Sequence, residues 1–333
     1  MGSTIGVGGD GTMKAIIQEG YGSADVLHLR DVAKPVVAEG RVLVRVRAAS
    51  VNALDWHTVH GGKIMRAVGS LMRQPENPVR GVDVAGVVEA VGENVTRFAP
   101  GDEVFGGAPS SFAEYARARE DRLELKPGNL SFEQAASVSV AGYTALQGLR
   151  DKGQVKPGQR VLICGAGGGV GTFAVQIAKA LGAHVTAVTR TANLEIVRSL
   201  GPDEVIDYTR EDFTRRGQRY DAVFDVAANR SLSDLRRVLT PNGVLVMAGA
   251  DKRGGIAIFT RIGAAFVRSR ILGQRIVFFV ANPNHEDLVV LKEMIEAGKL
   301  CPAIDRTYPL SEAREAVRYV GSGQAKAKVV ITA

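Results

Sequence analysis

The sequence predicts an α/β protein of two domains, a β barrel followed by a doubly wound parallel sheet. Three observations lead to this fold class. The chain has 333 residues, about twice the length of an ordinary domain. Short strand patterns punctuated by glycine and proline fill the part before Leu125. From Arg160 onward, strand and helix patterns alternate, as they do where crossover helices join parallel strands.

The composition is that of a globular protein, with 45% hydrophobic and 23% charged residues. Even the apolar stretch 256–272 is interrupted by three arginines, so no segment reaches the roughly 18 residues that a membrane-spanning helix needs. Cys164 and Cys301 are too few for a disulfide framework or a four-cysteine zinc site. We therefore expect a cytoplasmic protein with no membrane partner.

Positive charge gathers in one part of the chain, whose total net charge is +7. The segment 215–275 holds twelve Lys or Arg against four acidic residues, a net charge of +8. These arginines stand singly between apolar runs, with no interleaved aromatic residues. They indicate a solvated or cofactor-facing surface, and we expect no nucleic-acid partner.

The first domain is expected over residues 13–135. Residues 1–12 carry five glycines and no aromatic residue, and we interpret them as a flexible tail. Strands are expected at MKAIIQ, VLHLRDV, 41–51, VAGVVEAVG, DEVFGG, FAEYARA and RLELKP. Because no helical period interrupts them, we expect no parallel sheet in this domain. Residues 283–333, read as one helix over 286–297 and the strand KVVIT, are expected to complete it.

The second domain is expected over residues 136–282. A helix is predicted at 131–149, and six strands with intervening helices follow. The strands are RVLIC, HVTAVT, EVIDY, DAVFDVA, GVLVMAG and RIVFFVA. Six such strands are typical of a doubly wound nucleotide-binding sheet.

A glycine-rich loop joins the first of these strands to a helix. The loop is suited to a pyrophosphate, because glycine permits a tight turn and close approach while the helix N-terminus offers free N–H groups. Its candidate cofactor-binding residues are Gly165, Ala166, Gly168, Gly169, Val170 and Gly171. The context of strand, loop and helix predicts dinucleotide binding.

The end of the second strand predicts which dinucleotide is bound. An acidic residue that would hold a ribose 2′-hydroxyl is expected there, but residues 186–193 contain none. Arg190, with Thr189 and Asn193 as further donors, suits a 2′-phosphate instead. The predicted cofactor is NADPH (NADP).

Several motifs together resemble one family. They are SVNALDW at 50–56, GVDVAGVVEAVG at 81–92, PGDEVFG at 100–106, AGYTAL at 141–146, VLICGAGGGVGTFAVQIAKALGA at 161–183 and VIDY at 205–208. With these motifs the chain resembles the medium-chain dehydrogenase/reductase superfamily, in its zinc-independent branch of NADPH:quinone oxidoreductases and alkenal/enone reductases. The resemblance implies a GroES-like catalytic domain, a Rossmann domain and an active site between them.

Zinc-binding members of that superfamily carry ligands at positions that differ here. Asn52 stands in place of a cysteine, Gly81-Val82-Asp83 in place of Gly-His-Glu, and Val140 near a further ligand. The resemblance therefore implies no metal site. His57 and His60 share a helical face, but two imidazoles without a third ligand are not expected to bind zinc.

The resemblance also implies roles for individual residues. Asn52 and Thr144 would lie beside the nicotinamide, with Tyr143 as a proton donor or a packed ring. Asp55 would orient its neighbours, and Trp56, the only tryptophan, would line the substrate mouth or pack in the barrel. Further cofactor contacts are expected from Tyr208, Gly249, Phe279, Val280, Ala281 and Lys328, although relatives often have Gly-Lys where this chain has Ala327-Lys328.

We interpret the chain as an NADPH-dependent oxidoreductase that reduces quinones or α,β-unsaturated carbonyl compounds by hydride transfer, without zinc. One alternative is an enoyl-thioester reductase of the same fold. Another, of a different class, is a catalytically idle NADPH-binding sensor or RNA-binding scaffold. The expected partner is a small-molecule quinone or enone, and a homodimer through the strand RIVFFVA is a further possibility.

Overall fold

The computed structural model describes residues 11–61, 78–248 and 273–333, which fall into two compact units. Unit 1 comprises 1–140, 283–296 and 302–333, and unit 2 comprises 141–282 and 297–301. The first strand begins at Thr12, the last residue of the predicted tail. None of the helices in these ranges is long and apolar enough to cross a membrane.

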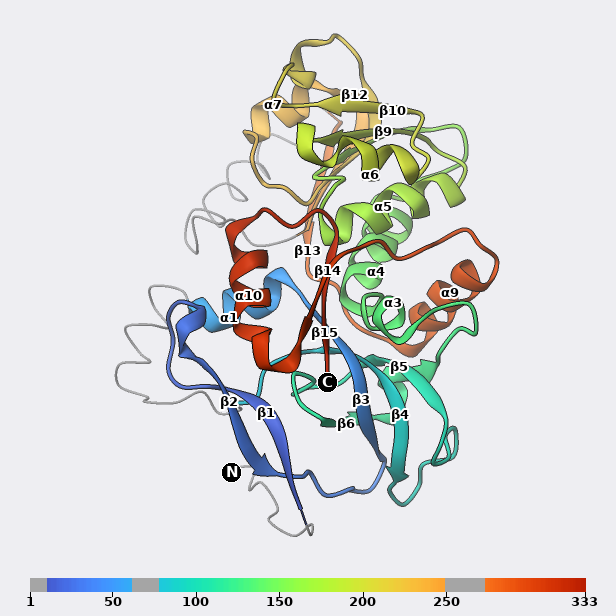
Figure 1. Ribbon diagram of the computed structural model, residues 1–333. Helices are drawn as coiled ribbons and strands as arrows, with labels where there is room; N and C mark the ends of the chain where they lie inside the picture. Colours follow the sequence, from blue (N-terminus) through green and yellow to red (C-terminus); the bar gives the residue numbers. More distant parts are fainter. Residues whose placement is uncertain (1–10, 62–77, 249–272) are drawn as a thin grey trace. The chain divides into compact units, whose positions relative to one another are not determined.

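Unit 1 contains a seven-stranded sheet in the order β14-β15-β3-β4-β5-β7, with β6 also paired to β3, and a separate antiparallel pair, β1 and β2 (Figure 1). Its strands are β1 (Thr12–Gln18), β2 (Leu27–Ala33), β3 (Arg41–Val51), β4 (Asp83–Val91), β5 (Glu103–Gly107), β6 (Tyr115–Arg119), β7 (Leu123–Leu125), β14 (Ile304–Pro309) and β15 (Lys328–Thr332). Its helices are α1 (Ala53–His60), α3 (Phe132–Ala136), α9 (His285–Glu296) and α10 (Ala313–Ser322).

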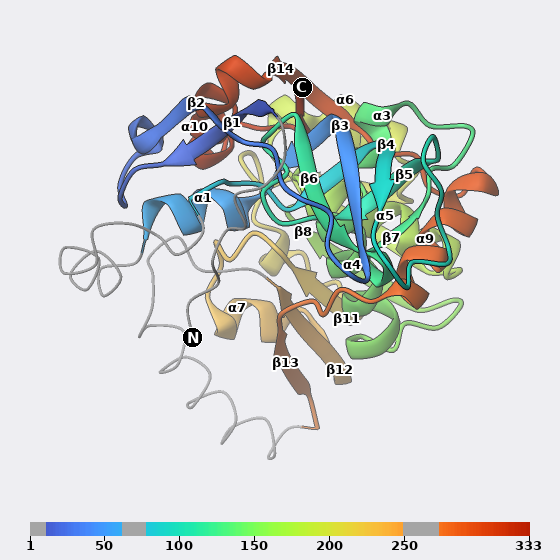
Figure 2. The same cartoon turned by 90° about the horizontal axis from the view of Figure 1, so that it is seen from below.

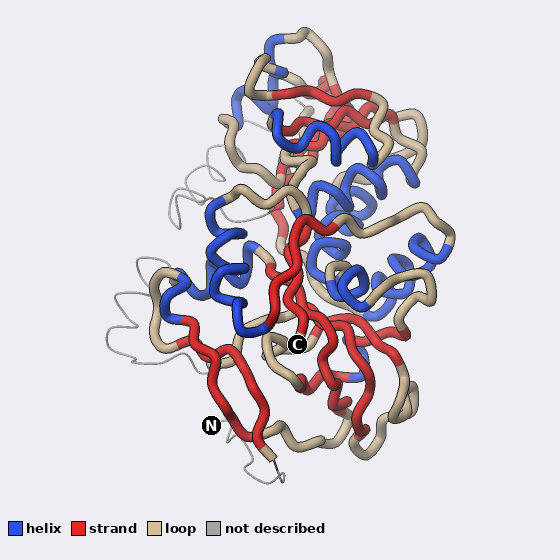
Figure 3. The backbone as a smooth tube through the Cα atoms, viewed as in Figure 1, coloured by secondary structure: helices blue, strands red, loops and turns tan. Residues whose placement is uncertain are grey.

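One pair of strands in this sheet corrects the sequence analysis. β14 and β15 run parallel and are joined by α10, whereas no parallel pairing and neither β14 nor α10 was expected. The signal for α10 was present, because Ala313, Ala316, Val317 and Val320 recur with a helical period. These residues pack with α1, β1, β3 and β15 in one hydrophobic core. In Figure 3, α10 is the blue helix beside the red strands β14 and β15. A second core fills the space between β3, β4, β5 and β6.

Unit 2 is built on a six-stranded parallel sheet in the order β10-β9-β8-β11-β12-β13, and Figure 2 shows its last three strands side by side. The strands are β8 (Arg160–Cys164), β9 (His184–Thr189), β10 (Glu204–Asp207), β11 (Tyr220–Asp225), β12 (Leu239–Ala248) and β13 (Arg275–Phe279). The helices are α4 (Ser139–Leu146, which begins in unit 1), α5 (Gly169–Ala180), α6 (Leu194–Ser199) and α7 (Leu232–Arg237). All six expected strands are present, and their order is the doubly wound one.

The helix expected over 131–149 is interrupted. Ser131 caps α3 by accepting the N–H of Gln134, and the hydroxyl of Ser137 donates to the Gln134 carbonyl after only five helical residues. The chain then forms α4 and a π-helical turn at 147–152. Serine side chains that bond nearby backbone groups compete with the helix in this way.

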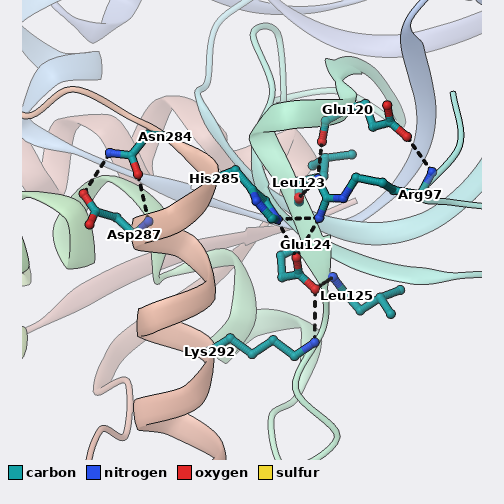
Figure 4. Close-up of polar contacts among 9 residues, drawn as sticks. All are labelled: Arg97, Glu120, Leu123, Glu124, Leu125, Asn284, His285, Asp287 and Lys292. Atoms are coloured by element: carbon teal, nitrogen blue, oxygen red, sulfur yellow. Dashed lines mark hydrogen bonds and ion pairs between the residues drawn. The ribbon is translucent and has the colours of Figure 1, made fainter. Parts of the chain in front are cut away.

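Helix α9 is attached to β7 by a buried carboxylate, Glu124 (Figure 4). Its oxygens meet Arg97 Nη2 at 2.7 Å, His285 Nε2 at 2.8 Å and Lys292 Nζ at 3.1 Å. Burial by itself raises the pKa of Glu124, but the hydrogen bonds from His285 and Lys292 outweigh it and hold that pKa below its ordinary value. The cluster therefore ties the return segment of the chain to the barrel sheet.

Candidate active site

The glycine loop follows β8 and leads into α5, as the sequence predicts. Gly165 adopts a positive φ of 86°, which glycine accepts at no steric cost. A Cβ at Gly171 would overlap the carbonyl oxygen of Gly165 and lie 2.7 Å from Cα of Ala166, which is fully buried. The first of these glycines makes the turn, and Gly171 lets α5 approach the strand.

The outer part of the loop forms a backbone cradle at the N-terminus of α5. Gly168 is the residue before the helix, and it and the next two residues, Gly169 and Val170, are partly exposed. A Cβ at Gly168 would meet only the carbonyl oxygen of Gly165, at 3.5 Å. A twelve-residue helix whose N-terminus is partly exposed, and where a Cβ at Gly168 would meet no side chain of the described residues within 4 Å, fits the pyrophosphate of a dinucleotide.

Asn193 supports this loop from inside. The side chain is buried, and its Nδ2 donates to the carbonyl of Gly167 at 3.1 Å. Its Oδ1 accepts from Nε of Arg190 at 3.3 Å. Asn193 therefore links the loop to the arginine, a contact that the sequence analysis did not foresee. Gly167, which the sequence analysis passed over, is needed because a larger residue would overlap Asn193.

Arg190 is the accessible cation at the end of β9. It is half-buried, whereas Thr189 before it is 2% exposed, and a Cβ at Gly167 would lie 2.7 Å from the Thr189 hydroxyl. Thr189 therefore faces the loop rather than a phosphate, contrary to expectation. The N–H of Tyr208 donates to the Thr189 carbonyl at 3.0 Å, which places the half-buried Tyr208 beside this strand end.

The other residues of unit 2 that were expected at the site differ in how deeply they are buried. Phe279 ends β13, is buried and pairs with Ala248, while Val280 is 83% exposed and Ala281 is half-buried. Gly249 lies outside the described residues. On α4, Thr144 is half-buried, and the Tyr143 ring is among the largest fully buried side chains. Its burial favours the packing role over proton donation.

A second cluster of polar residues lies in unit 1, where three neighbouring strands begin or end. The register pairs Ser50 of β3 with Asp83 of β4 on one side and with Val330 of β15 on the other. Continuing the same register by two residues brings Lys328 opposite Asn52. Nδ2 of Asn52 donates to Oδ2 of Asp83 at 2.9 Å, and Nζ of Lys328 donates to Oδ1 of Asn52 at 2.7 Å. The same ammonium lies 3.4 Å from Oδ2 of Asp83.

Lys328 is thus not placed where the sequence analysis put it. We expected it to contact the cofactor, but its side chain is 2% exposed and bonded to Asn52. Asp83 was not a candidate at all. The motif GVDVAGVVEAVG contains this aspartate at the start of a strand. Its partners come from distant parts of the chain, so the motif alone does not mark it as part of a cluster.

Asp55 adjoins this cluster at the start of α1. Its Oδ2 accepts the backbone N–H of Asn52 at 2.8 Å and its side chain is buried. Burial raises the pKa of Asp55 from 3.8 to about 7, and the charge of Asp83 adds to the rise, while the N–H of Asn52 and the ammonium of Lys328 oppose it. The orienting role of Asp55 stays a prediction, and its bond to the Asn52 N–H is the contact on which it depends.

Trp56 packs between two helices. Its ring stacks on that of His60 at 4.8 Å and meets His57 edge-on at 4.9 Å. A side chain at Gly321 of α10 would overlap the indole, so the helices touch here. These contacts support the packing interpretation of Trp56 over the substrate mouth.

The residues at the expected zinc positions do not fit a metal ion. Asn52 has both amide ends engaged, Val82 and Val140 offer no side-chain donor, and the ammonium of Lys328 lies against Asn52. Within the described ranges there is no group of three His, Cys, Asp or Glu residues that could hold a metal. No step of the chemistry is therefore assigned to zinc.

Two regions of the chain match known families. Residues 38–142 match the alcohol dehydrogenase GroES-like domain, and residues 200–331 match the zinc-binding dehydrogenases. The chain is 35% identical to 2-methylene-furan-3-one reductase of Solanum lycopersicum and 33% identical to the chloroplastic NADPH-dependent alkenal/one oxidoreductase of Arabidopsis thaliana, in each case over 96% of this chain and 79% of the relative. The solved structure of the quinone oxidoreductase from Coxiella burnetii superposes with a TM-score of 0.85 at 32% identity, covering 97% of this chain and all of that one.

Proposed function

Because this chain belongs to the medium-chain dehydrogenase/reductase superfamily, in the branch of the quinone and alkenal/one oxidoreductases, we propose that it reduces conjugated acceptors without a metal ion. It is an NADPH-dependent oxidoreductase of quinones or α,β-unsaturated carbonyl compounds. The metal-free chemistry and the roles of individual residues are the parts that we propose.

One observation carries the metal-free mechanism, the 2.7 Å contact between Nζ of Lys328 and Oδ1 of Asn52. The ammonium engages the oxygen at this position and would repel a divalent cation placed beside it. Without a Lewis acid to polarise a saturated carbonyl, the acceptor itself must be electron-poor. Quinones and enones meet that requirement because their conjugation makes a ring or β carbon electrophilic.

When bound, NADPH supplies the hydride. The chain's own residues bind and orient: the cradle at Gly168 and the N-terminus of α5 hold the pyrophosphate, and Arg190 meets the 2′-phosphate. At the predicted reaction centre the side chain of Asn52 bonds Asp83 and Lys328, and its backbone N–H donates to the carboxylate of Asp55. Catalysis then depends on alignment of donor and acceptor rather than on a catalytic metal.

The test is NADPH consumption with a panel of quinones, enones, enals and enoyl thioesters, together with saturated aldehydes. Conjugated acceptors should be reduced, and deuterium from labelled NADPH should appear on the β carbon of the saturated ketone formed from an enone. Saturated aldehydes should react poorly. Deuterium on the carbinol carbon of an allylic alcohol, or no turnover of any conjugated acceptor, would contradict the proposal. Turnover confined to enoyl thioesters would select the enoyl-thioester reductase instead.

Two further proposals concern the assembly and the location of the protein. Within the described part of unit 2, β13 is an outer strand of the sheet. It carries the exposed side chain of Phe278, and the exposed Val280 follows directly after its end. Such an edge supports a homodimer, which light scattering would test. The cytoplasmic location remains a prediction from the sequence, to be tested by cell fractionation.

A further inference from the structure

A lysine is completely enclosed in the unit 1 cluster. The Lys328 side chain is 2% exposed and that of Asp83 is 0% exposed. Lysine is almost never fully buried without a partner, because its charge loses hydration on burial. The partners of this ammonium therefore show why the fold retains it.

Lys328 is closer to the amide of Asn52 than to the carboxylate of Asp83, at 2.7 Å against 3.4 Å. Asp83 already accepts hydrogen bonds from the Ser50 hydroxyl at 2.7 Å, from Nδ2 of Asn52 at 2.9 Å and from the Val140 N–H at 3.1 Å. An ammonium needed only to neutralise Asp83 would be expected to make its short contact there. Its short contact is made to Asn52 instead.

The side chain of Asn52 is consequently held at both ends. Its oxygen accepts from a cation, and its nitrogen donates to an anion. Turning the amide over would place an N–H group against the ammonium and an oxygen against the carboxylate, so only one orientation is favourable. Hydrogen bonds to charged groups are the stronger kind, which makes the restraint strict.

We propose that Lys328 is a positioning residue for the reduction, which fixes the orientation of the Asn52 carboxamide by bridging it to Asp83. The proposal rests on the proposed function only for the place of Asn52 at the reaction centre. It assigns to Lys328 a role separate from cofactor binding, because its ammonium is enclosed and engaged within unit 1.

The kinetic test compares Lys328→Met in the wild-type protein and in the Asn52→Ala variant. Lys328→Met should lower kcat by about 10- to 100-fold with the Kd for NADPH unchanged, since a charged hydrogen bond is lost without touching the cofactor cradle. In the Asn52→Ala background the same substitution should change kcat by less than about twofold, because the group it acts through is gone. Lys326→Met, an exposed lysine two residues earlier, is the matched control and should leave kcat unchanged.

A second measurement needs neither cofactor nor substrate. In protein labelled with [15N]asparagine, the side-chain amide signal of Asn52 is identified by its loss in Asn52→Ala. Hydrogen exchange of that amide should be slow in the wild type and at least about tenfold faster in Lys328→Met, since the restraint on one end is removed. Lys326→Met should exchange like the wild type.

Three results would overturn the proposal. They are a weakened NADPH Kd with kcat retained, a kcat loss of equal size in the Asn52→Ala background, and unchanged amide exchange. If Lys328→Met does not fold, Lys328→Met is combined with Asp83→Asn, which removes both buried charges. A kcat restored to the wild-type value in this pair would show that Lys328 only neutralises Asp83 and would also refute the proposal. A kcat lower in the folded pair than in Asp83→Asn alone supports it, and a kcat equal to that of Asp83→Asn refutes it. If the wild type reduces no conjugated acceptor, the proposed function fails, and the amide exchange still decides the role of Lys328.

Discussion

Asp55→Asn should make the stability of unit 1 less sensitive to pH. The Asp55 carboxyl is buried, and its pKa is raised from 3.8 to about 7. A carboxyl whose pKa is higher in the fold binds its proton more tightly there than in the unfolded chain. Stability must then fall as the pH rises from about 4 to about 7, and it stays constant above that range. Asparagine keeps an oxygen for the Asn52 N–H but has no charge to bury.

The magnitude follows from the two pKa values. Their difference of about three pH units corresponds to a loss of about 4 kcal/mol, of which about 3 kcal/mol falls between pH 5 and pH 8. The free energy of unfolding of Asp55→Asn minus that of the wild type should therefore be about 3 kcal/mol larger at pH 8 than at pH 5, which means that the variant is relatively more stable at pH 8. Any cost of the substitution that does not depend on pH cancels in this comparison.

The assay is urea unfolding followed by the fluorescence of Trp56, the only tryptophan, which lies in α1 next to Asp55. Asp31→Asn provides the control, because the Asp31 side chain is 63% exposed and its surface ion pair should contribute less than about 1 kcal/mol at either pH. If Asp55→Asn changes the free energy of unfolding by the same amount at pH 5 and at pH 8, the reasoning is refuted, because Asp55 would then be ionised in the fold without penalty.

Four further outcomes are expected. Arg190→Ala should weaken NADPH binding by roughly 10- to 100-fold in a fluorescence titration and leave NADH binding nearly unchanged; equal weakening of both would mean that the arginine supports the fold instead. Gly171→Ala should destabilise unit 2 by about 1–3 kcal/mol and abolish the rise in melting temperature given by NADPH, because the added Cβ overlaps the loop. Gly128→Ala should have neither effect, because no atom lies within 4 Å of a Cβ at that position. Glu124→Gln should cost about 3 kcal/mol of stability at pH 7, since Arg97, Lys292 and His285 all lose the carboxylate that they contact. The cost should shrink at low pH as Glu124 itself becomes protonated, and a cost independent of pH would contradict the ion pairs. Chelation should leave activity intact, and elemental analysis that finds one zinc per chain would disprove the metal-free mechanism.

Much of the fold could be predicted because its signals are local. The alternation in β3, the six strands of unit 2 and the turn at Gly165 depend on residues within one element or one loop. The branch of the superfamily and the NADPH-dependent reduction of quinones or enones were also correctly predicted. The errors lie where local signals compete, as at Ser137, where a hydroxyl bonded to the backbone ends a helix that the apolar pattern alone would continue.

The sequence by itself predicted a barrel part, a parallel-sheet part and a dinucleotide loop, because periodicity and glycine placement are written in consecutive residues. The type of reaction was predicted from the resemblance of several short motifs to one family. Only the tertiary structure showed which partners Asn193 and Lys328 meet. Asn193 turns inward to Gly167, which is 26 residues away along the chain, and Lys328 meets Asn52 across 276 residues. Such contacts depend on the register between strands and on which side chains become enclosed. The free energy of a buried charge or amide is then set by the partners that the fold brings to it, and not by its neighbours in the sequence.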